Sequence, residues 1–166
     1  MSEILLVTGG SRGIGAATAI CAAKKGWDVA INYTRDANAA NKVAEEVRAL
    51  GRRSMEIKGD MTSEHDILNM FEQVEKDLGE ITGLVNSAGT TGKTARVEDM
   101  TASAIRGIME LNVVGLMLCC REAVKRMSIK NGGRGGYIVN VASAASRLGG
   151  PNEFVHYAAS KGAVDS

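Results

Sequence analysis

The sequence predicts an α/β fold in which a parallel, doubly wound sheet lies between two layers of helices. Short apolar runs alternate with longer stretches whose apolar residues recur about every 3.6 positions. Strands separated by helices of this length are joined by crossover connections, so they run parallel and carry helices on both faces. The 166 residues are enough for one domain with a sizeable core.

The first half of the chain is expected to form three strand–helix units. The strands are Ile4–Val7, Val29–Tyr33 and Ser54–Lys58, and the helices are Ile14–Lys25, Ala37–Leu50 and Ser63–Leu78. Gly51 is a natural stop for the second helix, and Ser63 with Asp66 matches an acidic capping box at the start of the third.

The second half continues the alternation with longer elements. Gly83–Val85 is expected to be the fourth strand, followed by one long helix from Thr101 to Met127. A glycine-rich break leads into a fifth strand, Tyr137–Val141, and another helix is expected to start near Glu153.

Composition argues against several classes of partner. Twenty Lys and Arg against nineteen Asp and Glu leave a net charge of +1, and aromatic residues make up 4% of the chain. Neither nucleic acid nor an anionic membrane is an expected partner. Because glycine is reached by residue 9 and no run of about 18 apolar residues occurs, neither a signal peptide nor a spanning helix is expected, and a cytoplasmic location is predicted.

Cysteine and histidine indicate no disulfide framework and no metal site. Cys21, Cys119 and Cys120 all fall in apolar, helix-periodic stretches, so core thiols in a reducing compartment are expected. His65 and His156 show no metal-ligand spacing to a Cys or a carboxylate pair.

A nucleotide site is predicted at the first strand–helix junction. Residues 8–15 read TGGSRGIG, a G-x-x-x-G-x-G pattern through Gly9, Gly13 and Gly15. Such glycines permit a tight turn, a close approach to pyrophosphate and close helix–strand packing, with the phosphates at the helix N-terminus. An ordinary glycine-rich turn is the alternative for the motif alone.

Further motifs follow in an order that resembles the short-chain dehydrogenase/reductase family. They are Asn86-Ser87-Ala88-Gly89, Asn112 in the long helix, Ser143 after the fifth strand, and Tyr157-x-x-x-Lys161. The resemblance runs from residue 4 to residue 166; residues 32–35 and 43–46 look like its 3-oxoacyl-(acyl-carrier-protein) reductase and glucose-dehydrogenase-like branch. It implies a single Rossmann-type NAD(P)-binding domain. Because family members continue beyond the equivalent of Ser166, the C-terminal substrate-loop portion is expected to be missing.

The resemblance implies hydride transfer between a nicotinamide and a carbonyl or secondary-alcohol substrate. Tyr157 is expected to exchange the proton, and Lys161, one helical turn away, to favour its phenolate and bind the nicotinamide ribose. Ser143 would polarise the substrate oxygen, and Asn112 would position a water in the proton relay. Ser143 could instead be only a strand-end turn residue.

The implied cofactor is NADP(H), with NAD(H) as the less favoured choice. The expected cofactor-binding residues are Gly9, Ser11, Arg12, Gly13, Ile14, Gly15, Asn32, Tyr33, Arg35, Asp60, Asn86, Ala88, Gly89, Tyr157 and Lys161. The second strand ends at Tyr33 without the acidic residue that binds the ribose hydroxyls in NAD-dependent relatives, and Arg12 and Arg35 can converge on a 2′-phosphate. The alternatives are solvated surface arginines and, for Asp60, a plain turn residue.

Other functions fit the motifs less well. Gly92-Lys93-Thr94 resembles the end of a Walker A loop, but position 87 holds Ser and no helix is expected to begin at Lys93. A nucleotide-sensing regulator and a sugar-nucleotide epimerase on the same fold remain alternatives. The long helix has apolar residues around most of its circumference, which predicts a homodimer or homotetramer.

Overall fold

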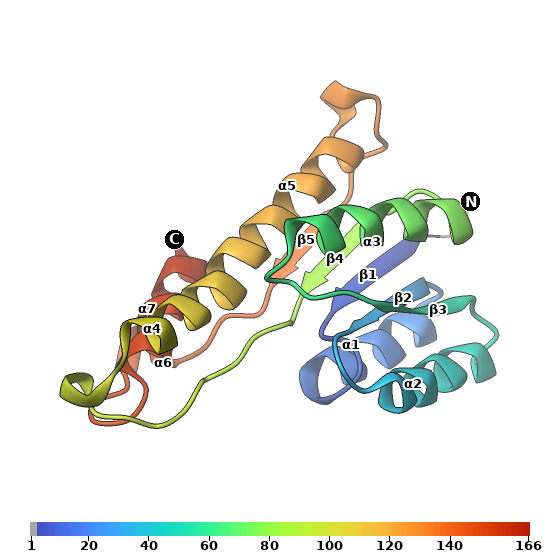
Figure 1. Cartoon of the computed structure of the whole chain (residues 1–166). Helices are drawn as coiled ribbons and strands as arrows, with labels where there is room; N and C mark the ends of the chain where they lie inside the picture. Colours follow the sequence, from blue (N-terminus) through green and yellow to red (C-terminus); the bar gives the residue numbers. More distant parts are fainter. Residues whose placement is uncertain (1–2) are drawn as a thin grey trace.

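The computed structural model describes residues 3–166 and contains a five-stranded parallel sheet with helices on both faces (Figure 1). The strands are β1 (Ile4–Thr8), β2 (Asp28–Tyr33), β3 (Ser54–Lys58), β4 (Gly83–Asn86) and β5 (Tyr137–Asn140). They are ordered β3-β2-β1-β4-β5, and every neighbouring pair is parallel. The predicted doubly wound α/β fold is confirmed, and each predicted strand boundary lies within one residue of the observed one.

Two separate cores hold the layers together, one on each face of the sheet. In Figure 1, α1 (Gly13–Lys24) and α2 (Ala37–Ala49) lie below the sheet, and α3 (Glu64–Asp77) lies above it with α5 (Leu116–Met127). Because strand side chains alternate between faces, Leu5 and Val7 join the core with α1 and α2, whereas Ile4 and Leu6 join the core with α3 and α5.

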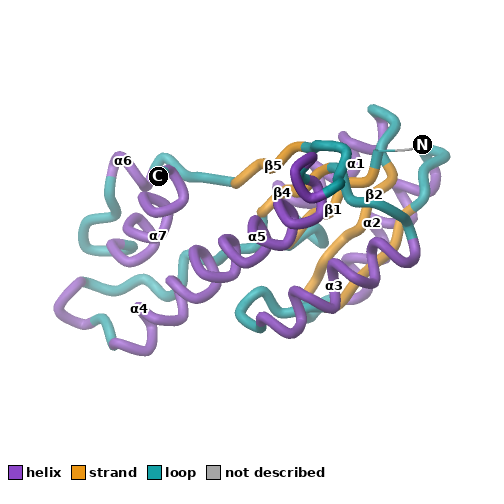
Figure 2. Tube along the Cα trace, turned by 90° about the horizontal axis from the view of Figure 1, so that it is seen from above, coloured by secondary structure: helices purple, strands orange, loops and turns teal. Residues whose placement is uncertain are grey.

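The remaining helical segments are short or lie at the far end of the domain. They are η1 (Val97–Asp99), α4 (Ala102–Met109), η2 (Glu110–Gly115), η3 (Ile129–Asn131), α6 (Ala145–Leu148) and α7 (Val155–Asp165). Figure 2 shows α4, α6 and α7 gathered beyond the end of β5, away from α3. The single turn α6 was not predicted.

The long helix expected from Thr101 to Met127 is continuous but not uniform. Thr101 caps α4 by accepting a hydrogen bond from the Ala104 amide (3.2 Å), and the π-helix η2 joins α4 to α5. A Cβ on Gly115 in η2 would lie 2.0 Å from the Met61 carbonyl oxygen. The widened turn and this glycine together let the helix backbone lie directly against the loop that follows β3.

The capping box predicted at α3 is only half formed. Ser63 Oγ accepts a hydrogen bond from the Asp66 amide (3.2 Å), as predicted. The Asp66 carboxylate, however, accepts from the Asp60 amide (3.0 Å) and from the Ser63 hydroxyl (3.2 Å) instead of the Ser63 amide. These bonds, the one from Asp60 foremost, lower the pKa of Asp66, so this carboxylate fixes the β3–α3 loop.

The three cysteines differ in burial, and the expectation of three core thiols is wrong for Cys21. Cys119 lies on the buried side of α5. Desolvation raises its pKa to about 12, with smaller contributions from Cys120 and Glu122. Cys120 is half-buried. Cys21 is exposed because it lies on the outer side of α1, whose inner side packs through Ala19 and Ala23.

The helix from Ala102 to Met127 is long and apolar enough to cross a membrane, with a mean hydropathy of 1.5 over its most apolar window. The sequence analysis expected no helix of this kind, because no uninterrupted run of about 18 apolar residues occurs in the chain. Length and composition are a weak indication, because core helices pass the same test. This helix packs through α5 on α3, β4 and β5. With only 22% of that window buried, it leaves an apolar outer surface.

Candidate active site

A cleft of about 760 Å³ opens at the carboxyl ends of the strands. It lies where the strand order changes direction, since β1 is flanked by β2 on one side and β4 on the other. Loops after all five strands, together with η2 and α7, contribute to its walls. Its size suits a small-molecule ligand, and open α/β sheets bind ligands at this place.

The glycine turn after β1 forms one wall, and at Gly9 and Gly15 it packs too tightly for a larger residue. Gly9 has φ +63°, and a Cβ there would lie 2.8 Å from Ala88 Cα in the turn after β4. A Cβ on Gly15 would lie 2.5 Å from the Gly9 carbonyl oxygen. The N-terminus of α1 has no side-chain cap at Arg12 and no acidic residue in its first turn. Its amides are therefore available for a pyrophosphate, and the turn fits a dinucleotide.

Asn32 does not line the cleft, although it was predicted as a cofactor contact. Its side chain is 1% exposed and lies beneath the turn. Its Oδ1 accepts from the Gly9 amide (3.1 Å), and its Nδ2 donates to the Gly59 carbonyl (3.1 Å). Asn32 thus ties the glycine turn to the end of β3, and we assign it a supporting role.

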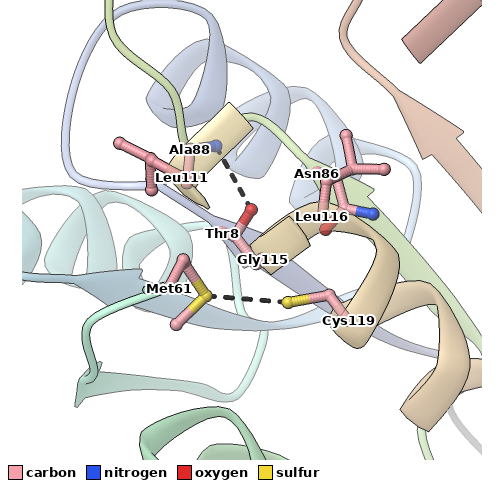
Figure 3. Close-up of a pocket in the computed structure, with 8 residues that line it drawn as sticks. All are labelled: Thr8, Met61, Asn86, Ala88, Leu111, Gly115, Leu116 and Cys119. Atoms are coloured by element: carbon pink, nitrogen blue, oxygen red, sulfur yellow. Dashed lines mark hydrogen bonds between the residues drawn. The ribbon is translucent and has the colours of Figure 1, made fainter. Parts of the chain in front are cut away.

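Asn86 and Gly15 are buried behind the cleft surface, whereas Gly13 is exposed and is not among the residues that line the cleft. Asn86 Nδ2 donates to Asn140 Oδ1 (2.9 Å) between the ends of β4 and β5. Figure 3 shows Asn86 in a small internal pocket with Thr8 and six other residues. In the same view the Ala88 amide donates to Thr8 Oγ1 (3.2 Å), which fixes the turn after β4.

The side chain of Asn112 is buried and has its hydrogen bonds filled by protein groups. Its Oδ1 accepts from the Thr90 amide (3.0 Å), and its Nδ2 donates to the Thr90 carbonyl (2.9 Å) and to Ser160 Oγ (3.0 Å). These bonds hold the loop after β4 against η2, and the water-positioning role of Asn112 stays a prediction.

The three other predicted catalytic residues meet at one end of the cleft. Tyr157, Lys161 and Ser143 all line it. Lys161 Nζ lies 6.0 Å from the centre of the Tyr157 ring and donates to the Val141 carbonyl (2.5 Å). Burial lowers the pKa of Lys161, an effect that Asp165 partly opposes. Ser143 Oγ accepts from the Ala145 amide (3.2 Å), so its hydroxyl proton remains available to a ligand. Ser143 is thus both a turn residue and a cleft residue.

The opposite end of the cleft carries the residues predicted to bind adenosine. Arg12, Tyr33, Arg35 and Asp60 all line it. Asp36, next to Arg35, uses its carboxylate to cap α2 by accepting from the Ala39 amide (2.9 Å). Asp60 accepts through Oδ1 from the Thr62 amide (2.9 Å) and hydroxyl (2.8 Å), which leaves Oδ2 for a ligand amine.

Several cleft residues were not predicted. They are Thr34, Met61, Thr62, Ser87, Thr90, Thr91, Gly107, Leu111, Val141 and Ala142. Most of them adjoin a predicted residue along the chain, and the carboxyl ends of the strands could have indicated them. Gly107 and Leu111 come from the long helix, where only the fold shows which side faces the cleft. Within residues 3–166 no group of three or more His, Cys, Asp or Glu side chains could hold a metal ion.

The known proteins to which the chain is similar include oxidoreductases. The chain is 48% identical over 163 residues to a protein of Escherichia coli (strain K12) named uncharacterized oxidoreductase YgfF, covering 98% of this chain and 66% of that protein. It is 32% identical over 164 residues to versicolorin reductase 1 of Dothistroma septosporum, covering 99% and 60%. A crystal structure of NAD+-bound xylitol dehydrogenase superposes with a TM-score of 0.90 at 33% identity, covering 98% and 60%.

The chain thus spans about 60–66% of the length of these relatives. The family model for short chain dehydrogenase matches residues 3–166. Together with the glycine turn and the Ser143, Tyr157 and Lys161 cluster in one cleft, this match establishes that the chain belongs to the short-chain dehydrogenase/reductase family.

Proposed function

We propose that the protein is an NAD(P)(H)-dependent oxidoreductase that interconverts a carbonyl compound and a secondary alcohol. One observation carries the proposal: Tyr157, Lys161 and Ser143 line the same cleft as the glycine turn and the uncapped N-terminus of α1. A dinucleotide with its phosphates at the amides of that N-terminus has room in the same cleft to extend toward Tyr157.

The protein's own groups supply binding and proton transfer. The Ser143 hydroxyl donates to the substrate oxygen and orients it. Tyr157 gives its phenolic proton to that oxygen during reduction, or removes the alcohol proton during oxidation. The Lys161 ammonium stabilises the phenolate between turnovers. When bound, the nicotinamide supplies or accepts the hydride.

Replacing Tyr157 tests this assignment. Tyr157→Phe keeps the ring but removes the proton donor, and we expect turnover of carbonyl substrates to fall by about 100-fold or more. The dissociation constant of the reduced cofactor, measured by fluorescence titration, should change little. Tyr137→Phe is the matched control, because Tyr137 is exposed on β5 outside the cleft.

Three outcomes would contradict the proposal. Unchanged turnover in Tyr157→Phe would remove the assigned role of this residue. A wild type that binds cofactor but turns over no carbonyl or alcohol would favour a nucleotide-sensing regulator. Turnover of nucleotide sugars alone would favour an epimerase.

NADP(H) is the proposed preference, supported by the residues around the adenosine end. Tyr33, Thr34 and Arg35 supply no carboxylate at the end of β2, and Arg12 approaches the same part of the cleft from the glycine turn. Arginine–phosphate hydrogen bonds are charge-assisted, each worth about 1.5–3 kcal/mol when well formed. The similar xylitol dehydrogenase has NAD+ bound in its crystal structure, so the preference of this chain requires its own measurement.

Steady-state kinetics with both cofactors measures the preference. Arg12→Ala combined with Arg35→Ala should raise the KM for NADPH by about tenfold or more, with a much smaller change for NADH. Arg134→Ala serves as the control, since Arg134 pairs with Glu80 outside the cleft. Equal losses for the two cofactors, or a wild type that favours NADH, would refute the preference.

We also propose that the protein assembles as a dimer or tetramer through the long helix. Val114, Met117 and Val124 are 40%, 64% and 52% exposed, and Ile105 on α4 is also exposed. Such a run of exposed apolar side chains is typical of an interface. Met117→Glu should shift sedimentation toward the monomer, and a monomeric wild type at micromolar concentration would contradict the assembly.

A further inference from the structure

Ser160 lies between Tyr157 and Lys161 on α7 and is completely buried, outside the cleft. Its hydroxyl donates to the Tyr157 carbonyl (2.7 Å) and accepts from Asn112 Nδ2 (3.0 Å). The proposed chemistry does not use this hydroxyl directly. Its contacts nevertheless reach the backbone of the proposed proton donor.

The same hydrogen bonds continue to another part of the cleft wall. Asn112 binds both backbone groups of Thr90. Because the Thr90 amide can only donate, the Asn112 side chain has one possible orientation, with Nδ2 toward Ser160. A network of hydrogen bonds, buried at the Asn112–Ser160 contact, thus runs from the loop after β4, through η2, to the helix that carries Tyr157.

Both ends of this hydrogen-bond network lie in the wall of the cleft. Thr90, Thr91 and Tyr157 all line the cleft, and they come from elements far apart in the sequence. At the other side of Tyr157, Lys161 attaches α7 to the end of β5 through the Val141 carbonyl. Ser160 therefore connects α7 by hydrogen bonds to the long helix and, through Asn112, to the loop at Thr90.

We propose that Ser160 is a positioning residue that sets the place of Tyr157 relative to the loop at Thr90 and to Lys161. The proposal rests on the proposed oxidoreductase function. Removing the hydroxyl leaves one N–H of Asn112 buried without an acceptor, and the network must shift to satisfy it. A displacement of about 1 Å at a reacting group is enough to lower a rate by about 100-fold.

The test compares Ser160→Ala with Ser166→Ala. Ser166 is on the same chain segment, and its hydroxyl also donates to a backbone carbonyl, that of Gly162 (3.2 Å), but it is exposed. We expect Ser160→Ala to lower kcat by about tenfold to 100-fold with little change in cofactor affinity. The midpoint of the pH–rate profile should also move by about half a pH unit or more, because Tyr157 and Lys161 no longer keep their relative position. Ser166→Ala should match the wild type in all three measurements.

Two further variants separate positioning from folding. Ser160→Cys keeps most of the volume and a weak donor and acceptor, so it should fold and lose less kcat than Ser160→Ala. In the double variant Ser160→Ala with Asn112→Ala, the loss should be clearly smaller than the product of the two single losses, since both residues act through one network.

The outcomes distinguish this role from the underlying function. An active wild type together with Ser160→Ala that keeps kcat and the pH profile of Ser166→Ala would overturn the positioning role alone. If Ser160→Ala does not fold, Ser160→Cys decides the question. A lowered kcat and a shifted pH midpoint at wild-type cofactor affinity would support the role, and a wild-type kcat and pH profile would overturn it. A wild type without any carbonyl or alcohol turnover would overturn both proposals.

Discussion

Three glycines of the nucleotide turn are expected to tolerate alanine to very different degrees. Gly13 has φ +55° and nothing within 4 Å of a built Cβ. Gly15 lies in α1, where a Cβ would meet the Gly9 carbonyl oxygen at 2.5 Å. Gly9 combines both problems, with φ +63° and the Ala88 backbone at 2.8 Å. The series separates backbone strain from steric conflict.

The expected losses of unfolding free energy follow from backbone strain and from steric conflict. Gly13→Ala should cost about 1–2 kcal/mol of unfolding free energy, from left-handed strain alone. Gly15→Ala gains up to about 1 kcal/mol of helix propensity. Against this, its Cβ is almost 1 Å closer than ordinary van der Waals contact to an oxygen of the backbone. Overpacking costs about 1–3 kcal/mol, so the net loss should be about 0–2 kcal/mol when the full propensity gain is subtracted. Gly9→Ala combines strain with overpacking and should lose about 2–5 kcal/mol.

Urea unfolding without cofactor measures the stabilities, and fluorescence titration with NADH and NADPH measures binding. Gly15→Ala and Gly9→Ala displace the turn, so cofactor affinity should fall by about tenfold or more. If Gly13→Ala lost as much stability as Gly9→Ala, or if Gly15→Ala bound cofactor like the wild type, the packing argument would be refuted.

Three further predictions concern Glu122, the cysteines and Gly89. Burial raises the pKa of Glu122, but hydrogen bonds from three basic neighbours outweigh it and lower the pKa from 4.5 to about 2. The ionised form therefore adds about 3 kcal/mol of unfolding free energy above pH 4.5, and this is lost as pH falls toward 2. In thermal unfolding, the melting temperatures of Glu122→Gln and the wild type should converge over that range, and a constant difference would contradict the role of the ionised carboxylate. Cys21 should react with N-ethylmaleimide in the native protein and Cys119 only after unfolding, as peptide mass spectrometry would show; equal native labelling would contradict this. A Cβ on Gly89 would lie 3.1 Å from Asn112 Oδ1, so Gly89→Ala should lower both the melting temperature and kcat, and wild-type values would count against the role of Asn112 in holding the loop.

Local patterns were sufficient for most of the secondary structure. Each strand is a short apolar run bounded by turn residues, and Gly51 and Gly79 follow α2 and α3 with positive φ. The Walker-like Gly92-Lys93-Thr94 lies in an irregular segment, not at a helix start, as the flanking residues had indicated. The exposure of single side chains was harder to predict. Because α1 is apolar on almost every side, its sequence does not show which side packs against β1 and β2, and therefore does not show that Cys21 is exposed.

The sequence by itself determined the α/β alternation, the glycine turn and the motif residues Ser143, Tyr157 and Lys161 that line the cleft, because these depend on spacing and residue type along the chain. Only the tertiary structure decided which of the predicted residues face a ligand. Asn32, Asn86 and Asn112 match motif positions, yet each has its side chain turned inward and hydrogen-bonded to a neighbouring element. A buried amide needs hydrogen-bond partners wherever they lie, and the partners of these three side chains come from segments 22 to 54 residues away. The Asn86 Oδ1 atom has no such partner in the part of the chain that the structure describes. The position of the partners is set by sheet order and helix packing, which no local pattern contains.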